Sequence, residues 1–359
     1  MESGVRSGPA PATLGLTSDS VRGAVAAFRL SCPALLRRPD ASGLSRPDDW
    51  RGPCEDAAGR LDIDGPDFFA HWFDTVVVGD GSSFATGYYE PEIAGARTHD
   101  FGYDVPVYRR PPDLVTGEFS GSPDAPVGRR ARGRMQDGQL VPYYDRAEIE
   151  NGALAGQGLE IAWARDPVEF FFLQIQGSGR LLLPDGGVMR IGYDGQNGRE
   201  YVGIGRVMRD RGLVGPNQLS MQGMMAWMRA NPDQARLLMQ ENKSFVFFKE
   251  LTGPGPLGAL GVQVVGHVSV AADPRFVPLG APVFLTLDRP EANGLWVAQD
   301  TGGAIKGANR FDTFWGAGIA ARVTAGGMSG HGRALILLPK PAVARLQAER
   351  NHGGPPAQL

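Results

Sequence analysis

The sequence predicts a mainly β protein with flanking helices, built from about two domains. A chain of 359 residues is long for one small core, and this length favours two domains. Its 51 glycines and 28 prolines are typical of short strands joined by tight turns. The second half holds short apolar runs without a long helical pattern between them, which favours a closed β-barrel. These runs are 244–250, 261–273, 282–287, 295–300 and 333–339.

The N-terminal part is expected to be helical before strands begin. Residues 18–36 start with Ser and Asp, which are good helix caps, and then repeat apolar residues at helical spacing. Segments 55–61 and 64–76 continue this pattern. From 76 to 97, β-branched and aromatic residues alternate with turn signals, which predicts strands. Segment 97–145 is rich in Pro, Arg, Asp and Gly, and we expect an exposed excursion with almost nothing to bury.

The middle of the chain is expected to combine a small sheet with helices. Segment 166–195 predicts three strands separated by a Gly-Ser-Gly turn and an Asp-Gly-Gly turn. Segment 200–242 is expected to be helical, with methionines and Trp227 at three and four spacing. A methionine stripe of this kind usually packs into a core.

Composition argues against a nucleic-acid-binding protein and against a protein that spans a membrane with a helix. Hydrophobic residues make up 42% and charged residues 21%, and the formal charge of −3 gives no strong field for nucleic acid. No run of about 18 apolar residues is present, and no apolar stretch near Met1 resembles a signal peptide. The start of the chain is compatible with a protein that follows a removed export signal. Cys32 and Cys54 would form a disulfide in an exported protein and stay two thiols in a cytosolic one, and both readings remain open.

Several kinds of site lack their sequence signatures. There is no Cys-X-X-Cys, no His pair at metal spacing and no phosphate loop, so we expect neither a metal nor an organic cofactor. His267 is expected to be a hydrogen-bonded core or rim residue. The glycines near 203 lack a dinucleotide-binding frame, and the Ser-Gly-His of 329–331 lacks a nucleophile elbow.

Three aspartates at strand ends are the candidates for chemistry. Asp273 follows one apolar run, Asp300 follows another, and Asp312 follows "NRF". A strand end can hold a carboxyl rigidly, as acid/base work requires. The alternative is that these side chains accept hydrogen bonds from turn amides, as many aspartates in turns do.

Five separated motifs resemble one known family. They are "GYYEPEIAGAR", "LQIQGSGRLLLPDG", "YDGQNGREYVGIG", "NKSFVFFKE" and "AQDTGGAIKGANRFDTFWG", and they run in order from about Thr86 to about Leu338. Together they resemble the membrane-bound lytic murein transglycosylase A family, with its C-terminal three-aspartate domain. Residues 1–75 resemble the family only loosely.

The resemblance implies a fold and a reaction. The fold is a double-psi β-barrel domain, 1–96 and 242–359, interrupted by a β-rich substrate-binding domain at 97–241, with a glycan-binding groove between them. The reaction cleaves the β-1,4 bond between N-acetylmuramic acid and N-acetylglucosamine in peptidoglycan and gives a 1,6-anhydromuramic product without water. The two alternatives are a hydrolytic muramidase at the same site and a glycan-binding protein without catalysis.

The resemblance also assigns roles to residues. Asp312 matches the catalytic acid, and Asp300 and Asp273 match the two other aspartates, of which we expect Asp300 to take part in catalysis and Asp273 to contact the substrate. We expect burial and the charge of Asp300 to raise the pKa of Asp312. Lys306 and Arg310 would lower that pKa, so we expect them to face substrate or Asp300 instead.

Further substrate contacts are expected from two places in the chain. One is the Gln-Gly-Ser-Gly stretch, with Gln174, Gln176, Gly177, Ser178 and Gly179. The other is the pair Tyr88 and Tyr89, whose rings could stack on sugars. Each has an alternative reading, a tight hairpin or a packed aromatic. The resemblance further implies a monomer on peptidoglycan glycan strands, with other cell-wall enzymes as further partners. It implies the periplasmic side of the envelope, at the outer membrane, through an anchor absent from this chain.

Overall fold

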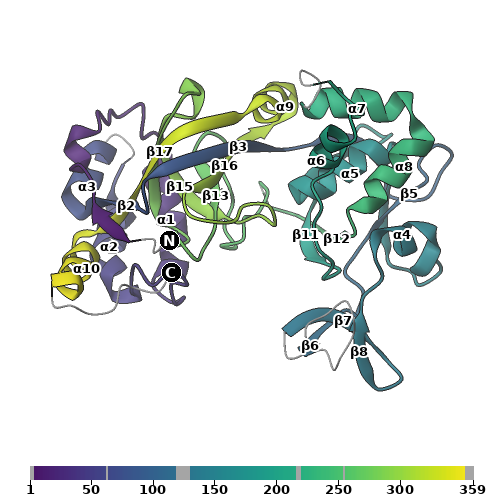
Figure 1. Cartoon of the computed structure of the whole chain (residues 1–359), viewed down its shortest axis with the longest axis horizontal. Helices are drawn as coiled ribbons and strands as arrows, with labels where there is room; N and C mark the ends of the chain where they lie inside the picture. Colours follow the sequence, from purple (N-terminus) through teal and green to yellow (C-terminus); the bar gives the residue numbers. More distant parts are fainter. Residues whose placement is uncertain (1–3, 62–63, 119–129, 216–219, 254, 352–359) are drawn as a thin grey trace. The chain divides into compact units, whose positions relative to one another are not determined.

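The chain folds into two compact units in the computed structural model, which describes residues 4–61, 64–118, 130–215, 220–253 and 255–351. Unit 1 joins Met1–Tyr89 with Leu257–Leu359, and unit 2 is Glu90–Pro256 (Figure 1). Both units are rich in sheet and carry helices, which confirms the predicted class.

Unit 1 is organised around a closed ring of strands. Its sheet has the order β1-β2-β17-β14-β15-β13-β16-β3, and a further pairing between β17 and β3 closes the last six strands on themselves. Within this ring of six strands no edge is left unpaired, while β2 and β1 extend the sheet outside the ring. The strands are β1 (Val5–Ser7), β2 (Phe73–Val78), β3 (Ser82–Glu90), β13 (Ser269–Ala272), β14 (Pro282–Leu287), β15 (Gly294–Asp300), β16 (Arg310–Ala317) and β17 (Ser329–Pro339).

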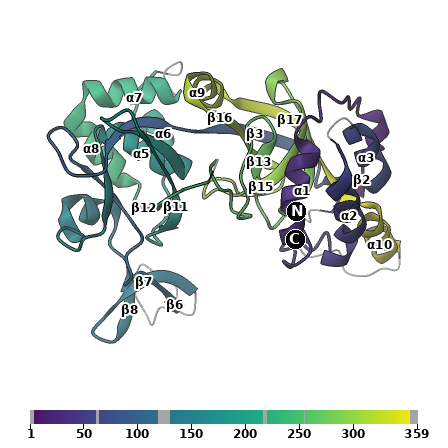
Figure 2. The ribbon, with the colours of Figure 1, turned by 180° about the vertical axis from the view of Figure 1, so that it is seen from behind.

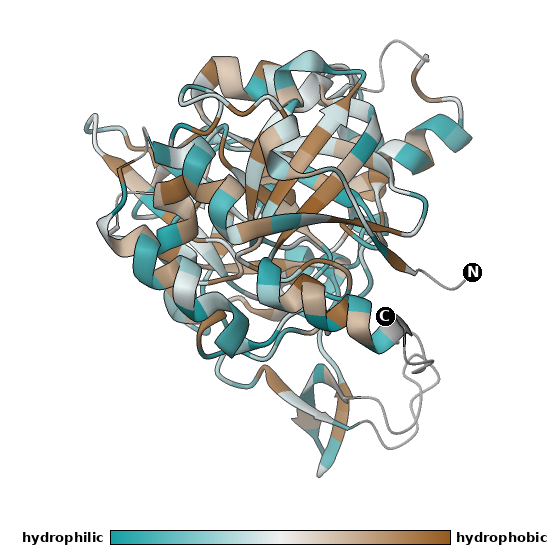
Figure 3. Ribbon diagram, turned by 90° about the vertical axis from the view of Figure 1, so that its left-hand side faces the viewer, coloured by the Kyte–Doolittle hydropathy of each residue, from teal (hydrophilic) through white to brown (hydrophobic). Residues whose placement is uncertain are grey.

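The helices of unit 1 lie outside this ring. α1 begins inside the segment predicted to be helical, and β2 begins three residues earlier than the sequence suggested. Hydrophobic residues concentrate in the strands, whereas the helix beside the C label carries hydrophilic bands (Figure 3). The helices are α1 (Ala24–Leu35), α2 (Arg51–Gly59), α3 (Gly65–Trp72), α9 (Gly318–Gly327) and α10 (Lys340–Asn351), with 3-10 turns at Pro11–Thr13, Pro47–Trp50 and Pro290–Ala292.

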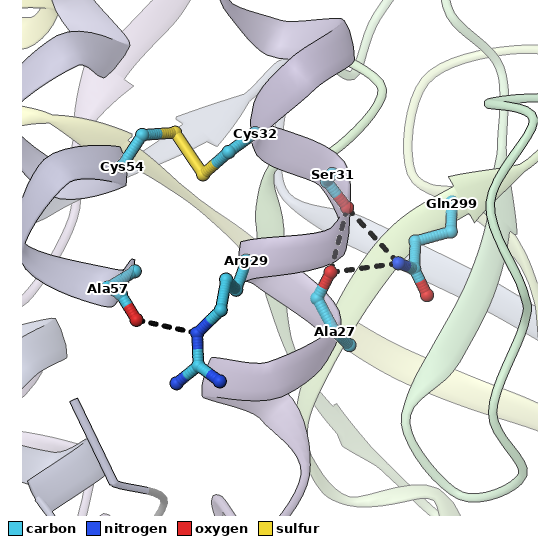
Figure 4. The surroundings of a disulfide bond; sticks show 7 residues. All are labelled: Ala27, Arg29, Ser31, Cys32, Cys54, Ala57 and Gln299. Carbon is cyan, nitrogen blue, oxygen red and sulfur yellow. Dashed lines mark hydrogen bonds between the residues drawn. A yellow bond between two sulfur atoms is a disulfide. The ribbon is translucent and has the colours of Figure 1, made fainter. Parts of the chain in front are cut away.

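A buried glutamine fastens α1 to the ring. Gln299, next to the end of β15, donates to the Ala27 carbonyl at 2.9 Å and to the Ser31 hydroxyl at 3.1 Å (Figure 4). Its own amide oxygen accepts a hydrogen bond from Ser269 of β13 at 2.6 Å. Because Gln299 has no exposed surface, each of these bonds is protected from water. The backbone just before Asp300 is therefore held from two sides.

The structure joins Cys32 of α1 to Cys54 of α2 in a disulfide, with 5.6 Å between the Cα atoms (Figure 4). This answers the question that the sequence left open. The bond ties α2 to α1, which itself packs on β15 of the ring.

Replacing both cysteines by serine is expected to lower the free energy of unfolding by about 3 kcal/mol, because the bridge closes a loop across 22 residues of separation in the unfolded chain. Urea unfolding of oxidised wild type, reduced wild type and the double variant measures this. The reduced protein and the variant should share one lowered midpoint. Equal midpoints for all three proteins would contradict a stabilising bridge.

Unit 2 contains two sheets. The larger has the order β12-β11-β10-β4-β9-β5, in which β10 and β4 are parallel. The smaller has the order β6-β7-β8 and stands apart from the larger sheet in both views (Figures 1 and 2). The strands are β4 (Glu92–Ala96), β5 (Val105–Tyr108), β6 (Val115–Glu118), β7 (Arg130–Gln136), β8 (Gln139–Pro142), β9 (Glu160–Ala164), β10 (Ser178–Leu182), β11 (Val188–Gln196) and β12 (Val246–Glu250).

The first strand predicted in segment 166–195 is wrong, because α5 (Pro167–Gln176) is a helix. Asp166 caps it by accepting hydrogen bonds from the amides of Val168 and Glu169, and Pro167 occupies the first turn. Gly177, with φ of 78°, ends it. An apolar run of this length fits a strand or a buried helix. The capping residues at its two ends identify it as a helix.

The prediction for 97–145 is also wrong in part. β5 lies in the larger sheet, and Val107 and Tyr108 are buried in the core of unit 2. β7 and β8 form a hairpin. Residues 119–129 of this segment lie outside the described residues.

The helices expected between 200 and 242 are confirmed as α6 (Ile204–Asp210), α7 (Met221–Ala230) and α8 (Pro232–Glu241), and the methionines of α7 at 221, 225 and 228 are buried. Unit 2 also has α4 (Arg146–Glu148), followed by a π-helical turn at Ile149–Ala153. Throughout the described residues, no helix has the length and apolar character needed to cross a membrane.

Candidate active site

Two aspartates lie on the two strands that flank one short strand of unit 1. Asp300 ends β15 and Asp312 lies near the start of β16, and both are in register with Ala271 of β13, which lies between those strands. Two strand spacings, about 10 Å, therefore separate the two backbone positions. The predicted positions at strand ends are confirmed for this pair.

Asp312 is half-buried and has one hydrogen-bond donor in the described structure. The Thr86 hydroxyl of β3 donates to Asp312 Oδ1 at 2.6 Å. Loss of hydration by burial raises the pKa of Asp312 to about 6, although the Thr86 hydrogen bond and the charge of Arg310 act in the opposite direction. Asp300 adds a smaller upward contribution, so burial is the main cause. A carboxyl with this pKa is partly protonated near neutral pH.

Arg310 does not lie where we expected. Its guanidinium stacks on the Phe84 ring at 4.7 Å and donates to the Thr86 hydroxyl at 2.9 Å, and a second nitrogen donates to the Phe311 carbonyl. Its charge therefore acts on Asp312 and lowers the pKa of that carboxyl. Arg310 therefore lies beside Asp312 and not at Asp300, because the β3 side chains hold it there, and its contact with substrate stays a prediction.

Asp300 is engaged by three donors. The amides of Ala259 and Thr301 donate to its Oδ1, both at 2.8 Å, and the Tyr88 hydroxyl donates to Oδ2 at 3.0 Å. Burial raises the pKa of Asp300, and these hydrogen bonds oppose that rise. Asp300 thus fixes the start of the glycine-rich loop, the chain before β13 and a tyrosine of β3.

Tyr88 is half-buried, with its ring 4.9 Å from that of Phe314, and burial holds the pKa of its hydroxyl well above the usual range. Its ring is therefore partly accessible while its hydroxyl belongs to Asp300. Tyr89 is 3% exposed, so stacking of this ring on a sugar is excluded in the described structure.

Asp273 anchors the loop between β15 and β16. It is 1% exposed, pairs with Arg275 at 2.6 Å and accepts from the Gly307 amide at 2.8 Å. Burial alone would raise the pKa of Asp273, but the hydrogen bonds from Arg275 and Gly307 outweigh it and lower the pKa to about 2. This side chain stays ionised and has a structural task, which matches the turn-amide alternative.

The loop that Asp273 anchors exposes its middle. The Thr301 amide donates to Asp300 Oδ1 at 2.8 Å and the Asn309 side chain donates to the Val78 carbonyl at 2.8 Å, so both ends of the loop are fixed, and Ile305 is buried within it. Between them Gly303 and Lys306 are exposed. Gly307 has φ of 101°, a conformation that favours glycine. The loop therefore presents a cation and backbone amides from a fixed base.

The predicted Gln-Gly-Ser-Gly contacts lie in unit 2. Gln174 is 3% exposed, accepts from Arg146 at 2.6 Å and donates to the Val246 carbonyl, so its amide belongs to the core. Gly177 ends α5, and a Cβ on Gly179 would collide with the Leu173 side chain at 2.4 Å. Ser178 is buried at the start of β10, whereas Gln176 is half-buried. Packing explains most of this motif.

Thr86 was missed by sequence reasoning. It lies two residues before Tyr88 on β3, and Phe84 lies two residues further back, so period-two spacing could have placed it on the same face. In the described part of the chain, no group of three or more His, Cys, Asp or Glu side chains is placed to hold a metal. His267 is exposed, with its ring against that of Trp315 at 5.0 Å, which agrees with a rim position.

Comparison with known proteins decides the family. The model of the MltA specific insert domain matches residues 84–249, and that of the 3D domain matches 268–338. Membrane-bound lytic murein transglycosylase A of Escherichia coli K12 is 33% identical over 272 residues, which cover 73% of this chain and 67% of that protein. This chain belongs to the membrane-bound lytic murein transglycosylase A family. The Vibrio cholerae protein of the same name is 32% identical over 264 residues, and the match covers 70% of this chain and 64% of that relative.

Solved structures of the family agree with this assignment. MltA from Neisseria gonorrhoeae has a TM-score of 0.74 at 35% identity, with 89% of this chain and 88% of that one covered. The membrane-bound lytic murein transglycosylase from Agrobacterium tumefaciens has a TM-score of 0.80 at 28% identity, covering 95% and 99%. E. coli MltA with bound chitohexaose has a TM-score of 0.68 at 27% identity, covering 94% and 95%. The resemblance seen in five sequence motifs is confirmed.

Proposed function

We propose that this chain is a peptidoglycan lytic transglycosylase. It cleaves the β-1,4 bond between N-acetylmuramic acid and N-acetylglucosamine and forms a 1,6-anhydromuramic product in cell-wall turnover. The observation that carries the proposal is Asp312, a carboxyl with pKa about 6 whose neighbouring carboxyls are bound to fixed partners. The family name of the relatives and the chitohexaose complex of E. coli MltA support a glycan substrate.

One carboxyl suffices for this reaction. Ordinary glycosidases use two, one to protonate the leaving oxygen and one to activate water or attack the sugar. In the proposed reaction Asp312 gives its proton to the glycosidic oxygen, and the bond from that oxygen to C1 breaks. The C6 hydroxyl of the same sugar attacks C1 and loses its proton to Asp312. Tethering gives this hydroxyl a high effective concentration, so no positioned water is needed.

The other residues of the site support Asp312 and meet the glycan. Asp300 holds Tyr88 and Thr301 in place, and its charge contributes to the raised pKa of Asp312. The exposed Lys306 and the amides around it offer donors to sugar hydroxyl and acetamido groups. Contacts from unit 2, through Gln176 and Ser178 among others, stay predictions.

The fold and the location extend the proposal. The closed six-stranded ring supports a double-psi barrel, which is the finer description of unit 1. The name of the relatives supports a position at the membrane, and we infer the periplasmic side of the outer membrane. The glycan-binding groove and the monomeric state stay predictions.

The cleavage rate is expected to fall as the pH rises above about 6, by about tenfold for each pH unit, because the acid form of Asp312 is then depleted. Initial rates of muropeptide release from sacculi between pH 5 and 8 measure this. Thermal unfolding at each pH controls for loss of fold. A constant rate from pH 6 to 8 would contradict Asp312 as the proton donor.

Product masses test the function itself. Purified protein is incubated with peptidoglycan sacculi, and the soluble muropeptides are weighed by mass spectrometry. A transglycosylase gives products one water lighter than those of a hydrolase. Reducing-end products would instead identify a hydrolytic muramidase, and protein that binds sacculi without releasing soluble product would identify a glycan-binding protein.

A further inference from the structure

We propose that Thr86 is a positioning residue that holds Asp312 Oδ1 and thereby assigns the catalytic proton to Oδ2. The inference rests on the proposed function and concerns which carboxyl oxygen of Asp312 transfers the proton. It starts from a chain of two hydrogen bonds: Arg310 Nη2 donates to Thr86 Oγ1 at 2.9 Å, and Thr86 Oγ1 donates to Asp312 Oδ1 at 2.6 Å.

The direction of this chain follows from the chemistry of its members. A guanidinium only donates, so Arg310 occupies an acceptor lone pair of the Thr86 hydroxyl. The single hydroxyl proton then points toward Asp312. Because Oδ1 accepts that proton, an additional proton on the carboxyl resides on Oδ2. Oδ2 accepts no hydrogen bond from any other described residue, so it is the oxygen left for substrate.

Thr86 is itself fixed by its surroundings. Its carbonyl accepts from the Thr313 hydroxyl at 2.9 Å, and that hydroxyl accepts from the Trp315 indole at 2.9 Å. Arg310 is held against the Phe84 ring. The β-branched side chain of threonine restricts rotation about χ1. The hydroxyl therefore keeps its place while the proton moves on and off Asp312.

With this assignment, both proton transfers of the reaction take place at Oδ2. Oδ2 gives its proton to the glycosidic oxygen, which leaves with the electron pair of its bond to C1. The C6 hydroxyl then forms the new bond to C1, and its proton returns to Oδ2. Thr86 remains hydrogen-bonded to Oδ1 throughout and stabilises the carboxylate between the two transfers.

The test compares Thr86→Val, which keeps the shape and removes the hydroxyl, with Thr86→Ser, which keeps the hydroxyl. Carbon-13 NMR of the Asp312 carboxyl in the full chain follows its titration. Thr86→Val should move the midpoint upward by about one pH unit, because a hydrogen bond to the charged form is lost. Thr86→Ser should keep the midpoint within about 0.3 pH unit of wild type.

Kinetics provide the second readout. Thr86→Val should lower kcat about tenfold with KM nearly unchanged, since only the positioning of Asp312 is lost, and its pH profile should move with the NMR midpoint. Thr86→Ser should recover most of kcat. A Thr86→Val protein that is folded and keeps both wild-type values would overturn the proposal, as would equal losses in the valine and serine variants.

If Thr86→Val does not fold, Thr86→Ala removes the same hydroxyl with a smaller side chain and leaves the charge of Arg310 in place. Its Asp312 midpoint should also rise, and an unchanged midpoint would overturn the proposal. If wild type cuts no glycan, the proposed function fails and the catalytic role of Oδ2 fails with it. The NMR titration still decides whether Thr86 holds Oδ1.

Discussion

Asp312→Asn is expected to lower the rate of glycan cleavage about 10³-fold, because one carboxyl serves as both acid and base and an amide can do neither at useful rates. The amide has nearly the shape of the carboxyl and can still accept from Thr86, so binding of glycan should persist. Rates of muropeptide release and pull-down with sacculi measure the two effects separately. A variant that cleaves at more than about a tenth of the wild-type rate would remove Asp312 from the mechanism.

The same substitution should raise stability. The pKa of Asp312 is about 6 in the folded protein and 3.8 as the ordinary value, so the fold binds the proton more tightly than the unfolded chain does. As the pH rises from 3.8 to 6, ionisation of this carboxyl progressively destabilises the fold, and above 6 the full cost remains. The neutral amide of the variant avoids that cost, so unfolding at pH 8 should require about 2 kcal/mol more than in wild type. Lost activity with unchanged or increased stability would exclude misfolding as the cause.

Arg146→Met is expected to destabilise unit 2 by about 3 to 5 kcal/mol, because it removes a buried cation from fixed acceptors. Arg146 is 2% exposed and donates to the carbonyls of Asn242 and Ser244 at 2.9 and 2.7 Å, and to Gln174 at 2.6 Å. Its guanidinium also lies 4.7 Å from the Phe171 ring. Burial lowers the pKa of Arg146 to about 10, so it remains charged at neutral pH.

Amide hydrogen exchange shows which part of the protein loses stability in Arg146→Met. Amides of α5 and β12 should lose protection, whereas those of the barrel strands should change little. Arg236→Met is the matched control, since Arg236 is exposed and, within the described part of the chain, its side chain makes one hydrogen bond, to Asn151 at 2.6 Å. It should change stability by less than about 0.5 kcal/mol. Equal effects of the two substitutions would contradict a core role for Arg146.

The sequence was sufficient to predict residues whose position follows from local pattern. Asp300 lies at the end and Asp312 near the beginning of an apolar strand. Such a position follows from the local sequence, whatever the order of strands in the sheet. The helices between 200 and 242 follow from spacing in the same way. The apolar run of α5 fits a strand or a helix, and only its Asp-Pro start and Gly177 distinguish the two.

Long-range contacts were beyond such reasoning. Thr86 lies 226 residues from Asp312 along the chain, so no local pattern links them. The same holds for Arg310, whose direction depends on Phe84 and Thr86 of a distant strand. Gln174 looked accessible in a glycine-rich motif, but Arg146 and Val246 hold it in the core. Side-chain direction, rather than strand position, is what the sequence left undetermined.

In the proposed reaction the sugar's own C6 hydroxyl, and not water, attacks C1 while Asp312 transfers the protons. Digestion of sacculi in water labelled with oxygen-18 distinguishes the two nucleophiles, with a hydrolytic muramidase in parallel. We expect muropeptides that carry no label from this protein and one labelled oxygen at each new reducing end from the muramidase. Labelled reducing ends released by this protein, and absent with Asp312→Asn, would contradict it and identify water as the nucleophile.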